Sequence, residues 1–277
     1  MVGKRLSGIQ RNGSLRHLAD LTWQEARETL LPETVVLLPI GAIEAHGPHL
    51  PLNTDVIIAA QLAFRAGNCL AEQGTCVVIA PPVCYGVSYV GSCFPGTIPA
   101  PREIVTGLVA CVLTELARWG PRRLVVVHAH LEPAHVDALS AAVALAAQTS
   151  GAAVAFPDKR EPRWATTLSE EFQRGARHAG AYETSLMFAV QPEAVRTELL
   201  PNLSPVDVDL PARLKAGART FAEAGGKDGY FGNPAMASVA EGERLFAALV
   251  TMVVTAVGEL GDWRALPVVA PESIDTS

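Results

Sequence analysis

Several side chains able to bind a metal ion fall within residues 37–55, directly after an apolar run rich in β-branched residues. The carboxylates and imidazoles of this segment are Glu44, His46, His49 and Asp55. A second pair, His130 and Glu132, follows another apolar run. Carboxylates and imidazoles gathered where strands end are typical of a metal site with oxygen and nitrogen ligands. We expect both groups to build one site that holds two metal ions.

The spacing within the two groups supports this interpretation. Glu44 and His46 are two residues apart, as are His130 and Glu132, and residues two apart in extended backbone project from the same face. Asp55 has two carboxylate oxygens and is able to bridge two cations. A lone histidine near a sheet is usually a hydrogen-bonded side chain, but five such ligands at strand ends are hard to explain as packing.

A pair of metal ions about 3.5–4 Å apart lowers the pKa of a shared water and polarises a carbonyl group. The pattern therefore predicts a hydrolase that attacks its substrate with a metal-bridging hydroxide.

Alternating apolar runs and amphipathic segments must position these residues. Strands are expected over 34–40, 76–83, 123–129 and 152–157. Helices are expected over 55–72, with Asp55 as its N-cap, and over 103–119, 132–148, 165–176, 180–190 and 236–259. This order predicts a three-layer α/β/α fold with a mainly parallel sheet. Ligands bind beyond the carboxyl ends of such strands, where Glu44, Ser88 and His130 would lie.

The 277 residues contain no internal repeat or low-complexity linker, so we expect a single domain. The two ends, residues 1–15 and 264–277, are expected to be loosely ordered.

The composition excludes several classes of function. A net charge of −6 argues against nucleic-acid binding, which needs a basic face. No run of 18 apolar residues and no signal-peptide core are present, so we expect a cytoplasmic protein that does not bind membranes. Only 18% of the residues are charged, which favours a homo-oligomer with buried subunit surfaces. The odd count of five cysteines, without a CxxC motif, predicts reduced and buried thiols.

Five blocks of the sequence resemble the creatininase family (creatinine amidohydrolase and its relatives). GAIEAHGPHLPLNTD, residues 41–55, is similar to the metal-binding signature of that family. The other blocks, in the family's order, are 85–97, 128–135, 177–195 and 229–242. The resemblance implies metal-dependent hydrolysis of a non-peptide C–N bond, with a cyclic amide favoured. It also implies a homo-oligomer, commonly a hexamer, that acts on a small molecule.

The resemblance also implies a role for individual residues. One metal ion would be held by Glu44, Asp55 and His130, and the other by His46, Asp55 and Glu132. The ions would be zinc, manganese or iron. His178 would protonate the leaving nitrogen, which suits a pKa near neutrality. Glu183 would orient His178 or border the metals, and Ser88 would contact the substrate near its carbonyl.

The chain departs from the family pattern around this site. His128 and Ala129 replace an Asn-Gly pair, and Leu131 replaces an aromatic residue that contacts substrate. Arg174 and Arg177 replace a tryptophan and an acidic residue beside the proton-donating histidine. Arginines suit a substrate that carries a carboxylate or phosphate better than they suit creatinine. The alternative is that both arginines lie on the solvated face of a helix.

Other interpretations stay open at this point. The substrate is alternatively a linear amide, either a formamide, as in deformylase relatives, or a peptide, as in peptide-maturing relatives. The chain is alternatively a scaffold that binds metal without turnover. We expect His49 to shape its loop or support the ligands, and His128 and His135 to be structural.

Overall fold

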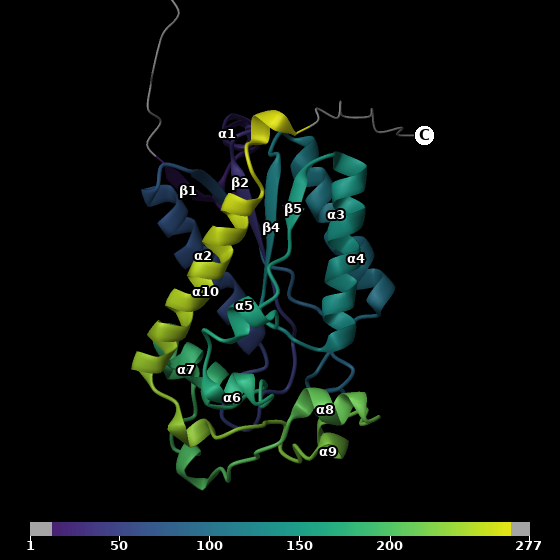
Figure 1. Cartoon of the computed structure of the whole chain (residues 1–277), viewed down its shortest axis with the longest axis vertical. Helices are drawn as coiled ribbons and strands as arrows, with labels where there is room; N and C mark the ends of the chain where they lie inside the picture. The colour runs from purple at the N-terminus through teal and green to yellow at the C-terminus, as the bar shows by residue number, and fades with distance from the viewer. Residues whose placement is uncertain (1–12, 267–277) are drawn as a thin grey trace, which may run out of the picture.

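Five short parallel strands form the middle layer of the molecule (Figure 1). The structure is a computed structural model and describes residues 13–266. The strands are β1 Ser14–His17, β2 Val35–Ile40, β3 Cys76–Ile79, β4 Arg123–His128 and β5 Ala153–Ala155. They lie in the order β1-β3-β2-β4-β5, and all neighbours are parallel. The apolar strands β2 and β4 therefore occupy the centre of the sheet, as their continuous hydrophobic runs require.

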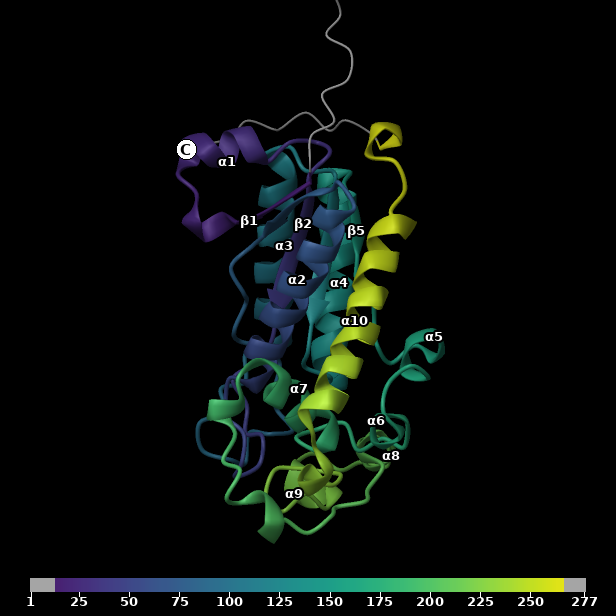
Figure 2. The same ribbon diagram turned by 90° about the vertical axis from the view of Figure 1, so that its left-hand side faces the viewer.

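Helices cover both faces of this sheet (Figure 2). One face is covered by α2 Thr54–Glu72 and α10 Val239–Glu259, with α7 Ala181–Val190 beside them, and the other by α3 Arg102–Arg118 and α4 Pro133–Ser150. Along β2, Val35 and Leu37 pack towards the first group of helices, whereas Val36 and Leu38 pack towards the second. This alternation buries both faces of the strand and confirms the three-layer α/β/α fold.

Short helices gather at the carboxyl end of the sheet (Figure 1). They are α6 Glu170–Gln173, α8 Leu210–Lys215 and α9 Phe221–Ala224. Helix α5 Pro162–Ala165 lies above them in the view of Figure 1, and α1 Trp23–Thr29 lies at the opposite end of the sheet. Half-buried Glu171 ties these segments together. Its carboxylate accepts hydrogen bonds from the backbone N–H of Tyr182 (2.9 Å) and of Asn233 (2.7 Å). Gly180 and Gly232 pack so closely against this carboxylate that a Cβ at either position would collide with it.

Helix α10 and the turn after it, residues 239–265, are long and apolar enough to cross a membrane by length and composition alone. One face of α10, including Leu245, Phe246 and Leu249, is buried in the core against α2 and α7. A helix buried in this way has an apolar composition for packing reasons, so the composition is weak evidence for a membrane span.

Several sequence expectations differ from the structure. Strand β1 begins at Ser14, within a segment expected to be loosely ordered, and pairs with the edge of β3. The expected helix over 165–176 is instead the two short helices α5 and α6, because the Ser169 side chain caps a new helix start by accepting from Phe172 N–H. At the other end, residues 263–265 form a 3₁₀ turn. The rest of both ends lies outside the described residues.

The expectation of buried thiols is wrong. Cys69, Cys76 and Cys84 are partly exposed, and Cys93 and Cys111 are exposed. All five cysteines are free.

Candidate metal centre

A buried cluster of carboxylates and histidines forms where the central strands end. Its members are Glu44 and His46 after β2, Asp55 in the first turn of α2, His130 after β4 and Glu183 in the first turn of α7. None of these residues is more than 4% exposed, so bulk water solvates the carboxylates poorly. The expected N-cap role of Asp55 is wrong, because α2 begins at Thr54 and Asn53 occupies the cap position. The Asp55 carboxylate is thus free to face the cluster.

Glu44, Asp55 and His130 form the first ligand group. His130 Nδ1 lies 3.1 Å from Glu44 Oε2 and 3.1 Å from Asp55 Oδ2. Donor atoms that share one cation at bond lengths of about 2.0–2.2 Å lie roughly this far apart. These residues are the three that the sequence analysis assigned to the first metal.

His46, Asp55 and Glu183 form the second ligand group. His46 Nε2 lies 3.6 Å from Asp55 Oδ1 and 3.6 Å from Glu183 Oε2. The two oxygens of Asp55 therefore face different groups, which is the arrangement that a bridging carboxylate needs.

Backbone carbonyls set the tautomer of both histidines. His130 Nε2–H donates to the Val87 carbonyl (2.8 Å), which leaves Nδ1 as the free acceptor at the cluster. His46 Nδ1–H donates to the Glu44 carbonyl (3.0 Å), which leaves Nε2 free. Hydrogen bonds of this kind fix the orientation of metal-binding histidines.

Glu132 lines the cavity beside Glu44, Asp55 and His130. This residue directly precedes α4, and its Oε2 accepts a hydrogen bond from Val90 N–H (3.0 Å). It is absent from both ligand groups, and its expected role as a ligand of the second metal stays a prediction. Burial raises the pKa of its carboxyl. Glu183 is the carboxylate that faces His46, and a hydrogen bond from Ala179 N–H (2.7 Å) holds it in place.

Several atoms of the cluster lack hydrogen-bond partners. They are both carboxylate oxygens of Glu44, Oδ2 of Asp55 and Nε2 of His46. Buried carboxylates without partners are costly, and a divalent cation satisfies such oxygen and nitrogen donors. The residues present therefore fit two metal ions that share Asp55.

The electrostatics of the cluster agree with this fit. Burial by itself lowers the pKa of His46, but Asp55, Glu183 and Glu44 together raise it to about 9. Burial and the neighbouring Asp55 raise the pKa of Glu183 to about 7. The cluster thus holds protons where cations would otherwise balance its charge.

His178 lies beside the cluster with one nitrogen free. Its Nε2–H donates to the Ala45 carbonyl (2.8 Å), while Nδ1 faces Glu44 Oε2 at 3.9 Å. The ring stacks on Phe221 with centroids 4.2 Å apart. Burial and then the nearby His46 lower the pKa of His178 to about 4, below the near-neutral value expected from sequence. The next residue, Ala179, has φ of 52°, a left-handed conformation that is strained for a residue with a Cβ.

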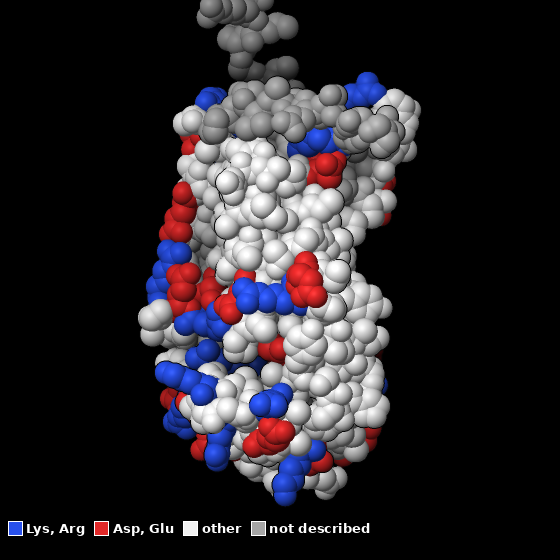
Figure 3. All heavy atoms as spheres, turned by 90° about the vertical axis from the view of Figure 1, so that its right-hand side faces the viewer, with Lys and Arg blue, Asp and Glu red and all other residues white. Residues whose placement is uncertain are grey.

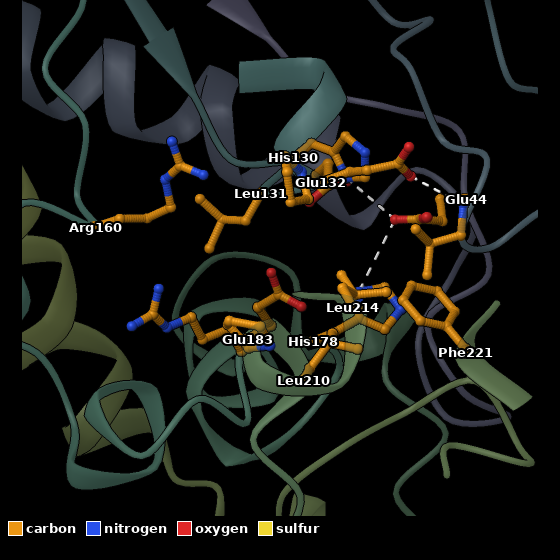
Figure 4. A pocket seen from close by; sticks show the side chains of 15 residues that line it. Glu44, His130, Leu131, Glu132, Arg160, His178, Glu183, Leu210, Leu214 and Phe221 are labelled. Carbon is orange, nitrogen blue, oxygen red and sulfur yellow. Dashed lines mark hydrogen bonds and ion pairs between the residues drawn. The ribbon is translucent and has the colours of Figure 1, made fainter. Parts of the chain in front are cut away.

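A cavity of about 640 Å³, including the part open to solvent, joins this cluster to the surface (Figure 4). Its apolar wall consists of Val90, Leu131, Pro133, Leu210, Pro211, Leu214 and Phe221. Figure 4 shows Arg160 at the far end of the cavity from Glu44, with Glu183 and His178 between them. The second arginine of the lining is Arg177. A substrate would therefore meet the ligand cluster at one end and Arg160 at the other, with Arg177 also in the lining.

The two arginines expected near His178 have different positions. Arg177 is half-buried, lines the cavity, and is held by a hydrogen bond from its Nε to the Phe172 carbonyl (2.9 Å). Arg174 is 68% exposed and pairs with Glu170 (3.0 Å), so the alternative of a solvated helix face describes it. Gly175, with φ of 98°, ends the helix between them and turns the chain.

Two further expectations concern substrate contact. Leu131 lines the cavity. Ser88 is fully buried and absent from the lining, and its Oγ lies 3.5 Å from His130 Nε2. Ser88 thus lies beside a ligand histidine, and its expected contact with substrate stays a prediction.

The remaining histidines lie outside both ligand groups. His49 Nε2 bonds Thr184 Oγ1 (3.0 Å), His128 Nδ1 donates to the His130 carbonyl (3.1 Å), and His135 Nδ1 accepts from Val87 N–H (3.3 Å). All three are buried and hold loops in place around the cluster.

The charged segment that follows β5 was not predicted to take part in the site. Arg160 lines the cavity, and its guanidinium is held by Asp158 (Nε to Oδ2, 2.9 Å). Charged residues directly after a strand of this sheet are the signal that identified Glu44 and His130. The same rule applied to β5 would have found Arg160.

Comparisons with known proteins agree with this geometry. The sequence profile of the creatininase family, described as creatinine amidohydrolase, matches residues 19–257. A mycofactocin precursor peptide peptidase from Mycolicibacterium smegmatis is 35% identical over 225 residues, which cover 78% of this chain and 81% of that protein. A creatinine amidohydrolase from Pseudomonas putida is 30% identical over 194 residues, which cover 64% and 73%.

Solved structures give the same result. A mutant creatininase of the Zn–Zn type has a TM-score of 0.72 at 25% identity, with 88% of this chain and 97% of that chain covered. A manganese creatininase has a TM-score of 0.65 at 26% identity, with 88% and 97% covered.

Proposed function

Because this chain belongs to the creatininase family, we propose that it is a metal-dependent amidohydrolase whose substrate carries a carboxylate near the scissile C–N bond. The observation that supports this proposal is the placement of Arg177 and Arg160 in the lining of the cavity that reaches the ligand cluster. Arginine binds carboxylates through paired, charge-assisted hydrogen bonds. Creatinine has no carboxylate to use such a pair.

We propose two divalent ions per subunit, one held by Glu44, Asp55 and His130 and the other by His46, Asp55 and Glu183. Zinc, manganese and iron all suit these donors. When bound, such ions lower the pKa of a water molecule and polarise a carbonyl group.

His178 moves the proton in this scheme. At neutral pH its imidazole is uncharged, because its pKa is about 4, and Nε2–H is committed to the Ala45 carbonyl. Nδ1 is therefore free to accept a proton from the attacking water and to deliver it to the nitrogen that leaves. The stacked Phe221 holds the ring in the orientation that this transfer needs.

For the substrate we favour a linear, peptide-like amide that ends in a free carboxylate. The peptidases of mycofactocin precursor peptide match this chain at 33–35% identity, and the apolar wall beside the arginines suits an apolar side chain. A cyclic amide that bears an acidic group is the second candidate, supported by the family description and by the creatinine amidohydrolase relative.

We also propose that the subunits associate, with a hexamer as the family resemblance implies. A broad area over α3 and α4 shows few charges (Figure 3). Ile104, Leu108 and Leu145 are exposed on these helices at 46–59%. A cytoplasmic location is proposed from the odd number of cysteines, none of them in a disulfide.

The arginines give a matched pair of variants. We expect Arg177→Ala to raise the Michaelis constant for a short peptide with a free carboxyl terminus by about 10- to 100-fold, as loss of a charge-assisted hydrogen bond does. Arg177→Ala should change the Michaelis constant for the carboxyl-amidated peptide only slightly. Arg174→Ala should leave the Michaelis constants of both peptides unchanged. An equal effect of Arg177→Ala on both peptides would contradict carboxylate binding. An acidic lactam hydrolysed faster than any peptide would favour the cyclic candidate.

A further inference from the structure

Lys159 is a lysine buried beside the ligand cluster. It follows β5, next to Asp158, and its side chain is only 1% exposed. It belongs to neither ligand group and does not line the cavity. Neither metal binding nor substrate contact therefore accounts for it.

Within residues 13–266, no carboxylate lies within 4.0 Å of the Lys159 ammonium. Nζ lies 5.8 Å from the ring centroid of Tyr182, the residue before Glu183. Tyr182 Oη and His128 Nε2 are buried without hydrogen-bond partners. Lys159 thus sits in a polar space behind the cluster, between α7 and the ends of β4 and β5.

The charges that face Lys159 belong mainly to one ligand group. Burial lowers its pKa, whereas Glu183, Asp55 and Asp158 raise it in that order of strength, and Arg177 lowers it. Glu183 and Asp55 are the two carboxylates of the second group, and Lys159 in turn lowers the pKa of Glu183.

A buried ammonium without an ion-pair partner is costly unless nearby charges compensate for it. Two carboxylates that face a cation site are also costly when the site is empty. Lys159 and the second group therefore stabilise each other. A divalent ion bound by His46, Asp55 and Glu183 would add a like charge near the same ammonium.

We propose that Lys159 is a positioning residue that acts as the permanent counter-charge of the second ligand group, stabilising that group when it is empty and lowering its affinity for a divalent ion. This inference rests on the proposed two-metal site. It implies that the ion of the second group is held less tightly than the same ligands would hold it without the lysine.

Lys159→Met tests the inference, since it keeps the length of the side chain and removes its charge. Metal-free protein is titrated with zinc in competition with a chromophoric chelator. We expect one of the two equivalents to bind about tenfold more tightly or better than in the wild type, because a unit charge in the protein interior acts strongly on a divalent ion. Lys159→Arg, which keeps the charge, should remain near the wild-type affinity.

Thermal unfolding supplies a readout independent of activity. Lys159→Met should lower the Tm of the metal-free protein and increase the rise in Tm that zinc produces. Unchanged or weaker zinc binding, with the same loss of Tm in both states, would overturn the inference and indicate packing alone. Lys159→Gln serves as the second uncharged variant if Lys159→Met does not fold. Wild-type protein that binds no zinc would instead overturn the proposed function.

Discussion

Two pairs of buried histidines lie side by side at the ends of the central strands and behave in opposite ways. His46 and His130 face carboxylates, and their pKa values are raised, that of His46 to about 9. Burial lowers the pKa of His128 to about 3 and that of His135 well below its ordinary value. The rings of His130 and His135 are only 4.8 Å apart between centroids.

The difference shows that burial and residue type do not identify a ligand histidine. All four rings are at most 4% exposed, so desolvation acts on each of them. A neighbouring carboxylate decides whether the ring binds a cation or stays neutral in the packing. The first pair therefore belongs to the ligand cluster, whereas the second pair has a structural role.

Removing the shared carboxylate should have the largest effect on this contrast. We expect Asp55→Asn to lose both metal equivalents and at least about 10³-fold in kcat/KM, because both groups depend on this side chain. Metal analysis of protein purified without chelator measures the loss. His135→Asn is the control and should keep both equivalents. Full metal content in Asp55→Asn would refute the bridging role.

A second test compares two glutamates. Glu183→Gln should lose one metal equivalent and about 10²-fold in activity, since Glu183 faces His46 at 3.6 Å. Glu132→Gln should keep both metal equivalents, because Glu132 Oε2 accepts a hydrogen bond from Val90 N–H. Loss of metal from Glu132→Gln alone would confirm the assignment of Glu132 made from the sequence.

The pH dependence of stability sharpens the comparison in metal-free protein. The raised pKa of His46 stabilises the fold fully below pH 6.5, and this contribution is lost as the pH rises through about 9. The lowered pKa of His49, caused by burial and then by His46, stabilises the fold above pH 6.5, and this contribution is lost as the pH falls through about 4. We expect the stability maximum near pH 6.5.

Urea unfolding at pH 5, 6.5 and 9 measures these changes. A pKa change from 6.5 to about 9 or to about 4, at 1.36 kcal/mol per pKa unit, makes each full contribution about 3 kcal/mol. His46→Gln should flatten the alkaline side of the profile and reduce the slope on the acid side without removing it, because burial is the larger cause of the lowered pKa of His49 and His46 the smaller. A profile that keeps its alkaline slope in this variant would show that another group is responsible.

The smallest effect should come from the second histidine pair. His128→Asn retains a donor able to bond the His130 carbonyl, and the metal content should stay at two equivalents. We expect a change of about 1 kcal/mol in the free energy of unfolding, because one hydrogen bond and a contact with Phe156 are altered. Loss of a metal ion in this variant would show that the pair also supports binding.

The central sheet and much of the cluster could be predicted from the sequence because both depend on local patterns. Continuous apolar runs mark β2 and β4, and their ends locate Glu44, His46 and His130. Strand β1, with the sequence SLRH, shows no such pattern, and it forms because the edge of β3 offers backbone partners.

The choice between Glu132 and Glu183 could not be made locally. Glu132 is two residues from His130, so its spacing suits a ligand. In the fold, however, its Oε2 accepts a hydrogen bond from the backbone N–H of Val90. Glu183 reaches His46 only because the tertiary fold brings α7 to the end of β2. Arg174 and Arg177 likewise differ because of the turn at Gly175, which the expected continuous helix did not include.

The carboxylate of Glu171 has a consequence for the dynamics of the molecule. It joins the start of α7, which bears Glu183, to a segment about fifty residues later, through the amides of Tyr182 and Asn233. Segments joined in this way open together as one cooperative unit. In hydrogen exchange these two amides would then share one opening rate, and the wall of the cavity would loosen as a whole, never residue by residue.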